Sequence, residues 1–278
     1  MAVETKPQST IDNPSLPTIQ RKDNYRLEPM VTALVFVAFI IYVTFRTFEN
    51  NFYATGALLS PLYSPEINTS WKIFGKHISP AIFILPVPLL FRTTCYYYRK
   101  AYYRAFFADP HACAVKEPFA RKGYMGERHP WMVWQNFHRY AFYLAAIVMV
   151  ILWWDTIWTF TYDTANYSSS GYVDSPGAIS AMAGRHFYMS VGSIVFLVNV
   201  ILLSLYTFSC HSWRHITGGC IDCFSKAKAR HSIWQRITHL NENHMLWAWC
   251  SLFSVALTDF YVRAVASGQF HDIPLIFF

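Results

Sequence analysis

The segment Phe208–Cys223, FSCHSWRHITGGCIDC, concentrates side chains that bind metals. It places three cysteines and two histidines within sixteen positions, directly after about twenty apolar residues. Thiolate and imidazole are the usual protein ligands of zinc and of iron–sulfur clusters. Because apolar helices seldom end in this way, the segment indicates a metal or redox site where a hydrophobic helix meets water.

Cysteine and histidine at one depth fit a Rieske-type [2Fe–2S] cluster, which takes two cysteines on one iron and two histidines on the other. The standard Rieske spacings are missing, and only an inverted His111-Ala112-Cys113 occurs. The assignment therefore depends on where candidate residues fall along the predicted helices. The predicted ligands are Cys113, Cys210, His138 and His244, with Cys95 as reserve thiol and His211 and His215 as reserve imidazoles.

A b-type haem is the alternative centre, because it needs two histidines from facing helices. His138 and His244 begin two predicted helices at the same end and supply one such pair. A second haem is poorly supported. His186 and His211 are 25 residues apart, which is about 37 Å along a helix, so they cannot serve one cofactor.

A CxxC motif, Cys220-Ile-Asp-Cys223, follows two glycines. This spacing suits zinc binding, an iron–sulfur site or thiol redox chemistry. A second CxxC is missing, so two unligated loop thiols are an equally good interpretation.

The composition is that of a membrane protein. The 278 residues are 54% hydrophobic and only 14% charged, against about 25% charged in soluble domains. The net charge of +7 is therefore interpreted as an orientation signal in a bilayer, and no nucleic-acid partner is expected. Residues 1–29 contain no signal peptide and are predicted to be a flexible tail.

Five apolar segments are each long enough to cross about 30 Å of hydrocarbon, which takes roughly 20 helical residues. We place them near residues 30–48, 79–98, 137–160, 186–210 and 244–266. They do not alternate as the strands of a β-barrel would, so they are predicted to be helices. The expected fold is all-α, with residues 30–278 as a single five-helix transmembrane domain.

Lysine and arginine fix the expected orientation. Eighteen of the 23 fall in the N-terminal tail and in the connections after the second and fourth segments, and five fall on the other side. The positive-inside rule then places the N-terminus in the cytoplasm and the C-terminus outside. All six cysteines lie in or near the cytoplasmic half, which argues against structural disulfides and suits free thiols or thiolate ligands.

Several runs together resemble the membrane-anchor subunit of actinobacterial, mycobacterial-type succinate dehydrogenase. They are CYYYRKAYYRAFF, PHACAV, QNFHRYAFY, LYTFSCHSWRH, NENHM and ALTDFYVR, and they span roughly Leu90 to Gly268. The resemblance implies a multi-pass protein of the bacterial inner membrane that binds menaquinone. It also implies partnership with a flavoprotein subunit and an iron–sulfur subunit, in an assembly that allows a higher oligomer.

The predicted chemistry is electron transfer from the iron–sulfur subunit, through the metal centre, to menaquinone. The quinone head group is expected beside the centre, against residues that flank His138 or follow the fourth helix: Trp134, Gln135, Arg139, Tyr140 and Trp213. Asp155 and Asp259, both in the outer half, are a predicted proton path, because ionisable residues at such depth are usually functional. Pairing of Asp259 with Arg263 is the structural alternative.

Two other functions compete with this one. The chain can be a cofactor-free anchor that only forms a quinone pocket, or it can be a transporter. The transporter is weakened because the sequence contains neither an internal repeat nor a pair of helices broken by Gly or Pro. Succinate chemistry itself would belong to a partner, because the chain carries no nucleophile, phosphate loop or carboxylate pair for it.

Overall fold

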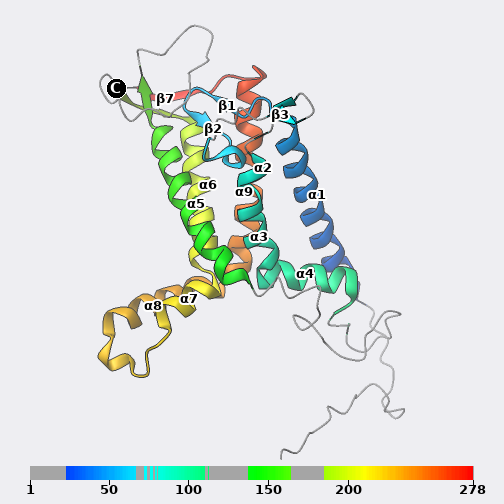
Figure 1. The fold of residues 1–278 in the computed structure, drawn as a ribbon, viewed down its shortest axis with the longest axis vertical. Helices are drawn as coiled ribbons and strands as arrows, with labels where there is room; N and C mark the ends of the chain where they lie inside the picture. The colour runs from blue at the N-terminus through cyan, green and yellow to red at the C-terminus, as the bar shows by residue number, and fades with distance from the viewer. Residues whose placement is uncertain are drawn as a thin grey trace, which may run out of the picture.

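A computed structural model describes residues 23–66, 81–109, 137–163 and 185–277, together with residues 72–73, 76–77, 79 and 112. Within that part of the chain, four helices are long and apolar enough to cross a membrane (Figure 1). They are α1 (Leu27–Glu49), α5 (His138–Trp158), α6 (Val191–Phe208) and α9 (His244–Ala266). Four of the five expected segments therefore form helices of spanning length.

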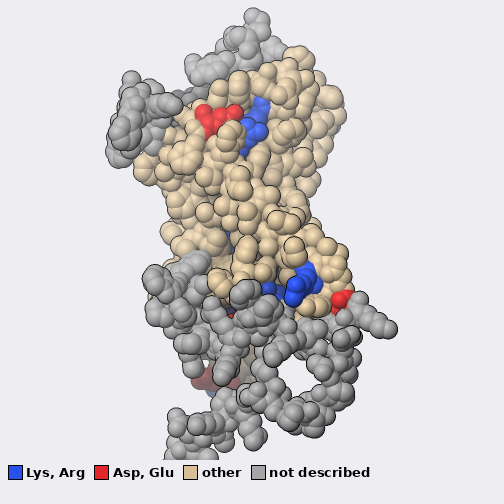
Figure 2. All heavy atoms as spheres, turned by 90° about the vertical axis from the view of Figure 1, so that its right-hand side faces the viewer, with Lys and Arg blue, Asp and Glu red and all other residues tan. Residues whose placement is uncertain are grey.

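The outer surface of this bundle is apolar, as contact with lipid requires. Leu34 of α1, Val150 of α5 and Leu257 of α9 are each at least 61% exposed. The middle of the face in Figure 2 is formed almost entirely by uncharged residues, and charged side chains gather toward its two ends. Polar groups turn inward instead, where Ser254 Oγ donates a hydrogen bond to Asn199 Oδ1 (2.9 Å). The protein is thus a membrane protein, and this contact satisfies two polar side chains within the bundle.

The second expected helix, residues 79–98, is divided into shorter helices, where the sequence predicted one. Its residues form α2 (Ala81–Ile84), α3 (Pro86–Thr94) and the start of α4 (Tyr96–Phe107). Proline at 86 and 88 lacks the N–H that a continuous helix needs. The stretch Ala81–Thr94 is shorter than a full span, and α4 runs across the base of the bundle rather than along it (Figure 1).

Short strands cover the opposite end of the bundle, which corrects the expectation of an all-α chain. Two small hairpins pair β1 (Ala54–Thr55) with β2 (Leu58–Leu59) and β3 (Lys72–Ile73) with β4 (Lys76–His77). A third antiparallel sheet has the order β5-β6-β7, from β5 (Thr161–Asp163), β6 (Arg185–Ser190) and β7 (Pro274–Phe277). The strands lie at the end where the chain finishes, away from α4 (Figure 1).

The fourth expected helix begins five residues later than its predicted start at His186. Residues up to Ser190 pair in β6, and α6 begins at Val191. Ser190 caps the helix: its hydroxyl accepts from the backbone N–H of Ser193, and the Ser193 side chain caps the Ser190 N–H in return. This capping box fixes the start of α6, because it satisfies amide groups that have no partner within the helix.

Two helices leave the bundle at the end where α4 lies. After α6 come α7 (His211–Gly218), the short 3₁₀ turn η6 (Phe224–Lys226) and α8 (Lys228–Glu242). They project to one side as a hairpin (Figure 1). Arg230 closes it by donating to the backbone carbonyls of Thr217 and Gly219. Helices α7 and α8 therefore form a lateral hairpin at the end of the bundle where α4 lies.

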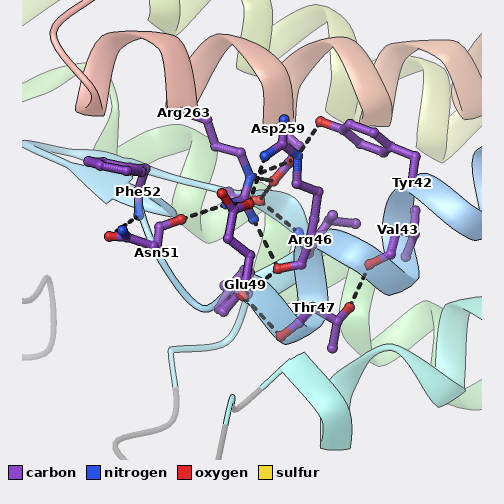
Figure 3. A network of polar contacts seen from close by, with 12 residues as sticks. Tyr42, Val43, Arg46, Thr47, Glu49, Asn51, Phe52, Asp259 and Arg263 are labelled. Atoms are coloured by element: carbon purple, nitrogen blue, oxygen red, sulfur yellow. Dashed lines mark hydrogen bonds and ion pairs between the residues drawn. The ribbon is translucent and has the colours of Figure 1, made fainter.

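A buried polar network joins α1, α9 and the loop that follows α1, near the strand-covered end of the bundle (Figure 3). Asp259 is 0% exposed. It accepts from Arg263 Nε (2.9 Å) and from the Tyr42 hydroxyl (2.6 Å), and it bonds the Ser60 hydroxyl. Arg263 also donates to Glu49 (3.1 Å). Such paired charges hold the helix ends together, but removal of one partner leaves the other buried and unpaired.

We predict that Arg263→Gln destabilises the protein by about 3–5 kcal/mol, because it strands the Asp259 carboxylate in the interior. Thermal unfolding of the detergent-solubilised protein measures the loss. Arg46→Gln is the matched control, since Arg46 pairs with Glu49 while both side chains are partly exposed. Its ion pair is worth about 1 kcal/mol or less. Equal unfolding temperatures for the two variants would contradict the prediction.

Candidate functional site

Two cysteines lie at equivalent bends in the chain. Cys95 separates α3 from α4, and Cys210 separates α6 from α7. Their backbone angles are nearly the same, with φ −64° and ψ 134° at Cys95 and φ −62° and ψ 142° at Cys210. This extended conformation cannot continue a helix. Each cysteine therefore follows the end of a bundle helix, and the next helix leaves in another direction.

Each cysteine meets a histidine that begins another helix. The distance from Cys210 Sγ to His138 Nε2 is 3.1 Å, and from Cys95 Sγ to His244 Nε2 it is 3.5 Å. Cys95, Cys210 and His244 are almost completely buried, at 2%, 1% and 3% exposed. Two thiols and two imidazoles from four different helix ends thus converge at one level of the bundle.

The residue before each cysteine holds the other histidine. Thr94 Oγ1 is 2.8 Å from His138 Nδ1, and Ser209 Oγ is 2.6 Å from His244 Nδ1. The dipeptide Thr94-Cys95 therefore contacts His138 through its hydroxyl and His244 through its thiol. The dipeptide Ser209-Cys210 contacts His244 through its hydroxyl and His138 through its thiol. The site has an approximate two-fold arrangement that is invisible in the sequence.

These hydroxyls also assign the protons of the imidazoles. Thr94 Oγ1 donates to the Leu90 carbonyl (2.7 Å), and Ser209 Oγ donates to the Tyr206 carbonyl (3.1 Å). Since each hydroxyl has one proton, it accepts from the Nδ1–H of its histidine. We therefore assign both Nε2 atoms as unprotonated. An unprotonated Nε2 with an oriented Nδ1–H is the state in which histidine binds a metal.

Aromatic rings close the site from the sides. Phe91 stacks on His138 with 4.8 Å between ring centroids, and Tyr206 stacks on His244 with 5.2 Å. Trp213 of α7 packs against Phe142 at 5.8 Å. Aromatic rings therefore cover one side of each imidazole.

The structure brings together three of the four predicted ligands, Cys210, His138 and His244, and adds the reserve thiol Cys95. Cys113 lies outside the described residues. No group of three or more His, Cys, Asp or Glu among the residues that the structure covers is arranged to hold a single metal ion. The four side chains instead form two thiol–imidazole pairs.

The reserve imidazoles His211 and His215 pair with each other. Their Nε2 atoms are 2.8 Å apart across one turn of α7, and both residues are exposed. Partial burial, together with His215 and Arg214 nearby, lowers the pKa of His211 below its ordinary value. The two reserve imidazoles therefore contact each other, and neither forms a hydrogen bond with a described cysteine.

Three of the predicted quinone contacts lie among the described residues. Trp213 is half-buried next to Phe142, one ring away from Phe91. Arg139 and Tyr140 are exposed on α5, where Arg139 Nε donates to the Tyr143 hydroxyl (3.4 Å). The other two, Trp134 and Gln135, fall outside the described residues. A quinone contact at these five positions stays a prediction.

The two outer acids lie at the far end from this site. Asp155 bonds the Ser64 hydroxyl, and Asp259 forms the ion pair with Arg263 that its spacing allows. The structural alternative for Asp259 is therefore present as a contact. A proton path through the two acids stays a prediction.

Several residues near the cysteines were not predicted from the sequence. Arg92 of α3 is only 5% exposed and donates to Tyr98, Ala248 and Ser251. A charge within an apolar segment is a recognisable signal of function. Thr94 and Ser209 give no such signal, because hydroxyl residues are common at helix ends.

The CxxC thiols lie at the tip of the lateral hairpin, where both are exposed. Cys223 Sγ is 2.8 Å from Ser225 Oγ. Hydrogen bonds from the Ser225 side chain and backbone lower the pKa of the Cys223 thiol. Because the thiolate is the reactive form, this thiol is activated toward electrophiles.

We predict that Ser225→Ala raises the pKa of Cys223 and slows its alkylation by iodoacetamide at pH 7.5 by about two- to fivefold. The rate rises with pH through the thiol pKa, so the variant's profile shifts to higher pH. Peptide mass spectrometry in a Cys220→Ser background reports Cys223 alone. Superimposable pH profiles with and without the Ser225 hydroxyl would show that it does not activate the thiol.

Apolar helices around two buried cysteine–histidine pairs define a multi-helix membrane protein with a polar site at one end. Residues 27–268 match the family described as actinobacterial succinate dehydrogenase subunit SdhC. A chain in the solved Mycobacterium smegmatis Sdh1 complex in the apo form is 38% identical, with a TM-score of 0.76 over 94% of this chain and 96% of that chain. No curated protein matches the chain. The chain belongs to the actinobacterial SdhC family, whose members are membrane-anchor subunits of succinate dehydrogenase.

Proposed function

We propose that this anchor passes electrons from the iron–sulfur subunit of succinate dehydrogenase to menaquinone through a Rieske-type [2Fe–2S] centre. The ligands are Cys95, Cys210, His138 and His244. Cys95 takes the place first assigned to Cys113, because it is the thiol next to His244. The single observation that carries this proposal is that two thiols contact two imidazoles at one level of the bundle: Cys210 contacts His138, and Cys95 contacts His244.

The chemistry of these four side chains fits the group. When bound, a cluster with two cysteine and two histidine ligands accepts and releases one electron at a time. The chain's own contribution is to hold the imidazoles by their Nδ1–H groups on Thr94 and Ser209 and to exclude water with aromatic rings. A b-type haem fits less well, because each Nε2 faces a thiol rather than the opposite imidazole.

The orientation follows from charge. By sequence, 18 of the 23 lysines and arginines belong to the N-terminal tail and to the two connections that follow the cysteine-bearing helix ends, so this end faces the cytoplasm, with the N-terminus inside and the C-terminus outside. The chain crosses the bacterial inner membrane five times, with α2 and α3 together as the short second crossing. At the cytoplasmic end it binds the iron–sulfur subunit, which in turn holds the flavoprotein subunit. The quinone head group enters beside Trp213, within reach of Arg139 and Tyr140.

Absorption and EPR spectra of the purified complex test the centre. An EPR signal of the reduced protein with a low average g value, without haem bands, supports the [2Fe–2S] assignment. A sharp Soret band with α-peaks would replace it by haem. Absence of both would leave a cofactor-free quinone-binding anchor.

We predict that replacing His138 and His244 together by Ala abolishes the EPR signal and quinone reduction. The apolar helices still insert, and succinate oxidation with an artificial acceptor that draws electrons upstream survives. The double replacement of His211 and His215 by Ala is the matched control, since it removes two imidazoles from the same end and should keep the signal. Normal iron content and normal quinone reduction in the first variant would disprove the ligand assignment.

A further inference from the structure

Arg92 is a buried cation held by neutral groups. Its guanidinium donates to the Tyr98 hydroxyl (2.7 Å), the Ala248 carbonyl (3.1 Å) and the Ser251 hydroxyl (3.0 Å). Among the described residues no carboxylate pairs with it, although it is only 5% exposed. A buried charge without a counter-charge is costly in a low-dielectric interior. The position therefore calls for negative charge nearby.

Tyr206 is a buried phenol whose hydroxyl is unpaired. The residue is 1% exposed, and its hydroxyl finds no hydrogen-bond partner within the described part of the chain. Burying such a donor without a partner is unfavourable. Its ring lies between the guanidinium of Arg92, 4.7 Å from the ring centroid, and the imidazole of His244.

Both groups lie near the thiols of the site, where Tyr206 interacts electrostatically with Cys95, Arg92 and Cys210. Arg92 lies one helical turn before Cys95 and accepts the backbone N–H of that residue on its carbonyl (3.1 Å). An unpaired donor and an unpaired cation thus stand together on the thiol side of the site. Both stabilise negative charge there.

We infer that Tyr206 and Arg92 set the reduction potential of the centre. The Tyr206 hydroxyl donates a hydrogen bond to sulfur, and the Arg92 guanidinium supplies the counter-charge. Reduction adds one electron and hence one negative charge to the centre. Both groups therefore stabilise the reduced state more than the oxidised state. Hydrogen bonds to sulfur and net charge are the protein's means of adjusting such potentials. This inference rests on the proposed iron–sulfur function.

Tyr206→Phe is the decisive variant, because it removes one hydroxyl and leaves the ring. An EPR-monitored redox titration of the whole complex should show a lower midpoint, with the ratio of reduced to oxidised centre at a fixed potential falling about tenfold. For one electron that corresponds to about 59 mV. The thermal unfolding temperature should change little, since among the described residues the hydroxyl has no hydrogen-bond partner besides the sulfur inferred here.

Tyr63→Phe is the matched control. Tyr63 is equally buried, at 0% exposed, but its hydroxyl donates to the Arg46 carbonyl (2.8 Å) in the far half of the bundle. This variant should unfold at a lower temperature while the midpoint stays unchanged. The two tyrosines thus separate a structural role from an electrostatic one.

Arg92→Gln should also lower the midpoint, and Arg92→Lys should keep it closer to the native value, because only the second variant keeps the charge. An unchanged midpoint in Tyr206→Phe, with a normal signal in the native complex, would overturn the inference and leave the proposed function intact. A native complex without any iron–sulfur signal would overturn the proposed function itself.

Discussion

The extended backbone at Cys95 and Cys210 is the constraint on which the rest of the inner end depends. A helix that enters from the bilayer must stop where the chain turns along the membrane surface, and at both points it stops on a cysteine. The bend projects the thiol into the bundle instead of along the helix face. It also places the preceding hydroxyl, Thr94 or Ser209, one residue away, where it reaches the histidine that the thiol does not. The same backbone conformation therefore occurs twice. It positions the two thiols beside the two imidazoles, and it positions the hydroxyls that bond the Nδ1 atoms of those imidazoles.

The two ends of the bundle solve the same problem differently. Near the strands, the carboxylate of Asp259 meets the guanidinium of Arg263, so charge is balanced within the chain. At the cysteine end, Arg92 has only neutral acceptors. Polar groups inside a membrane must be satisfied within the protein, and at the first end Asp259 and Arg263 satisfy each other. The second is built around charge that the described side chains do not supply.

Hydropathy was sufficient for the helices whose ends coincide with the apolar runs. The bounds of α9 agree with those predicted, and α5 lies within two residues of its prediction. The start of α6 was wrong because Arg185–Ser190 pairs with strands far along the chain on either side, and a local window contains no trace of such contacts. The break at Cys95 was missed for a similar reason. Nothing in the residue types around it indicates that ψ changes from helical to extended.

The same distinction explains which site residues were predictable. Cys210, His138 and His244 were identified because they mark helix ends at one depth, and depth follows from hydropathy. Tyr206 was not, because a tyrosine late in an apolar helix is ordinary in a membrane interface belt. Only the packing reveals that its hydroxyl is buried and has no hydrogen-bond partner among the described residues. Candidate ligands of a metal centre can therefore be predicted from residue type and from position at the helix ends. The residues that we infer to adjust its potential, Tyr206 and Arg92, are recognised only from three-dimensional packing, because the inferred role depends on a hydrogen bond and a charge without a partner among the described side chains.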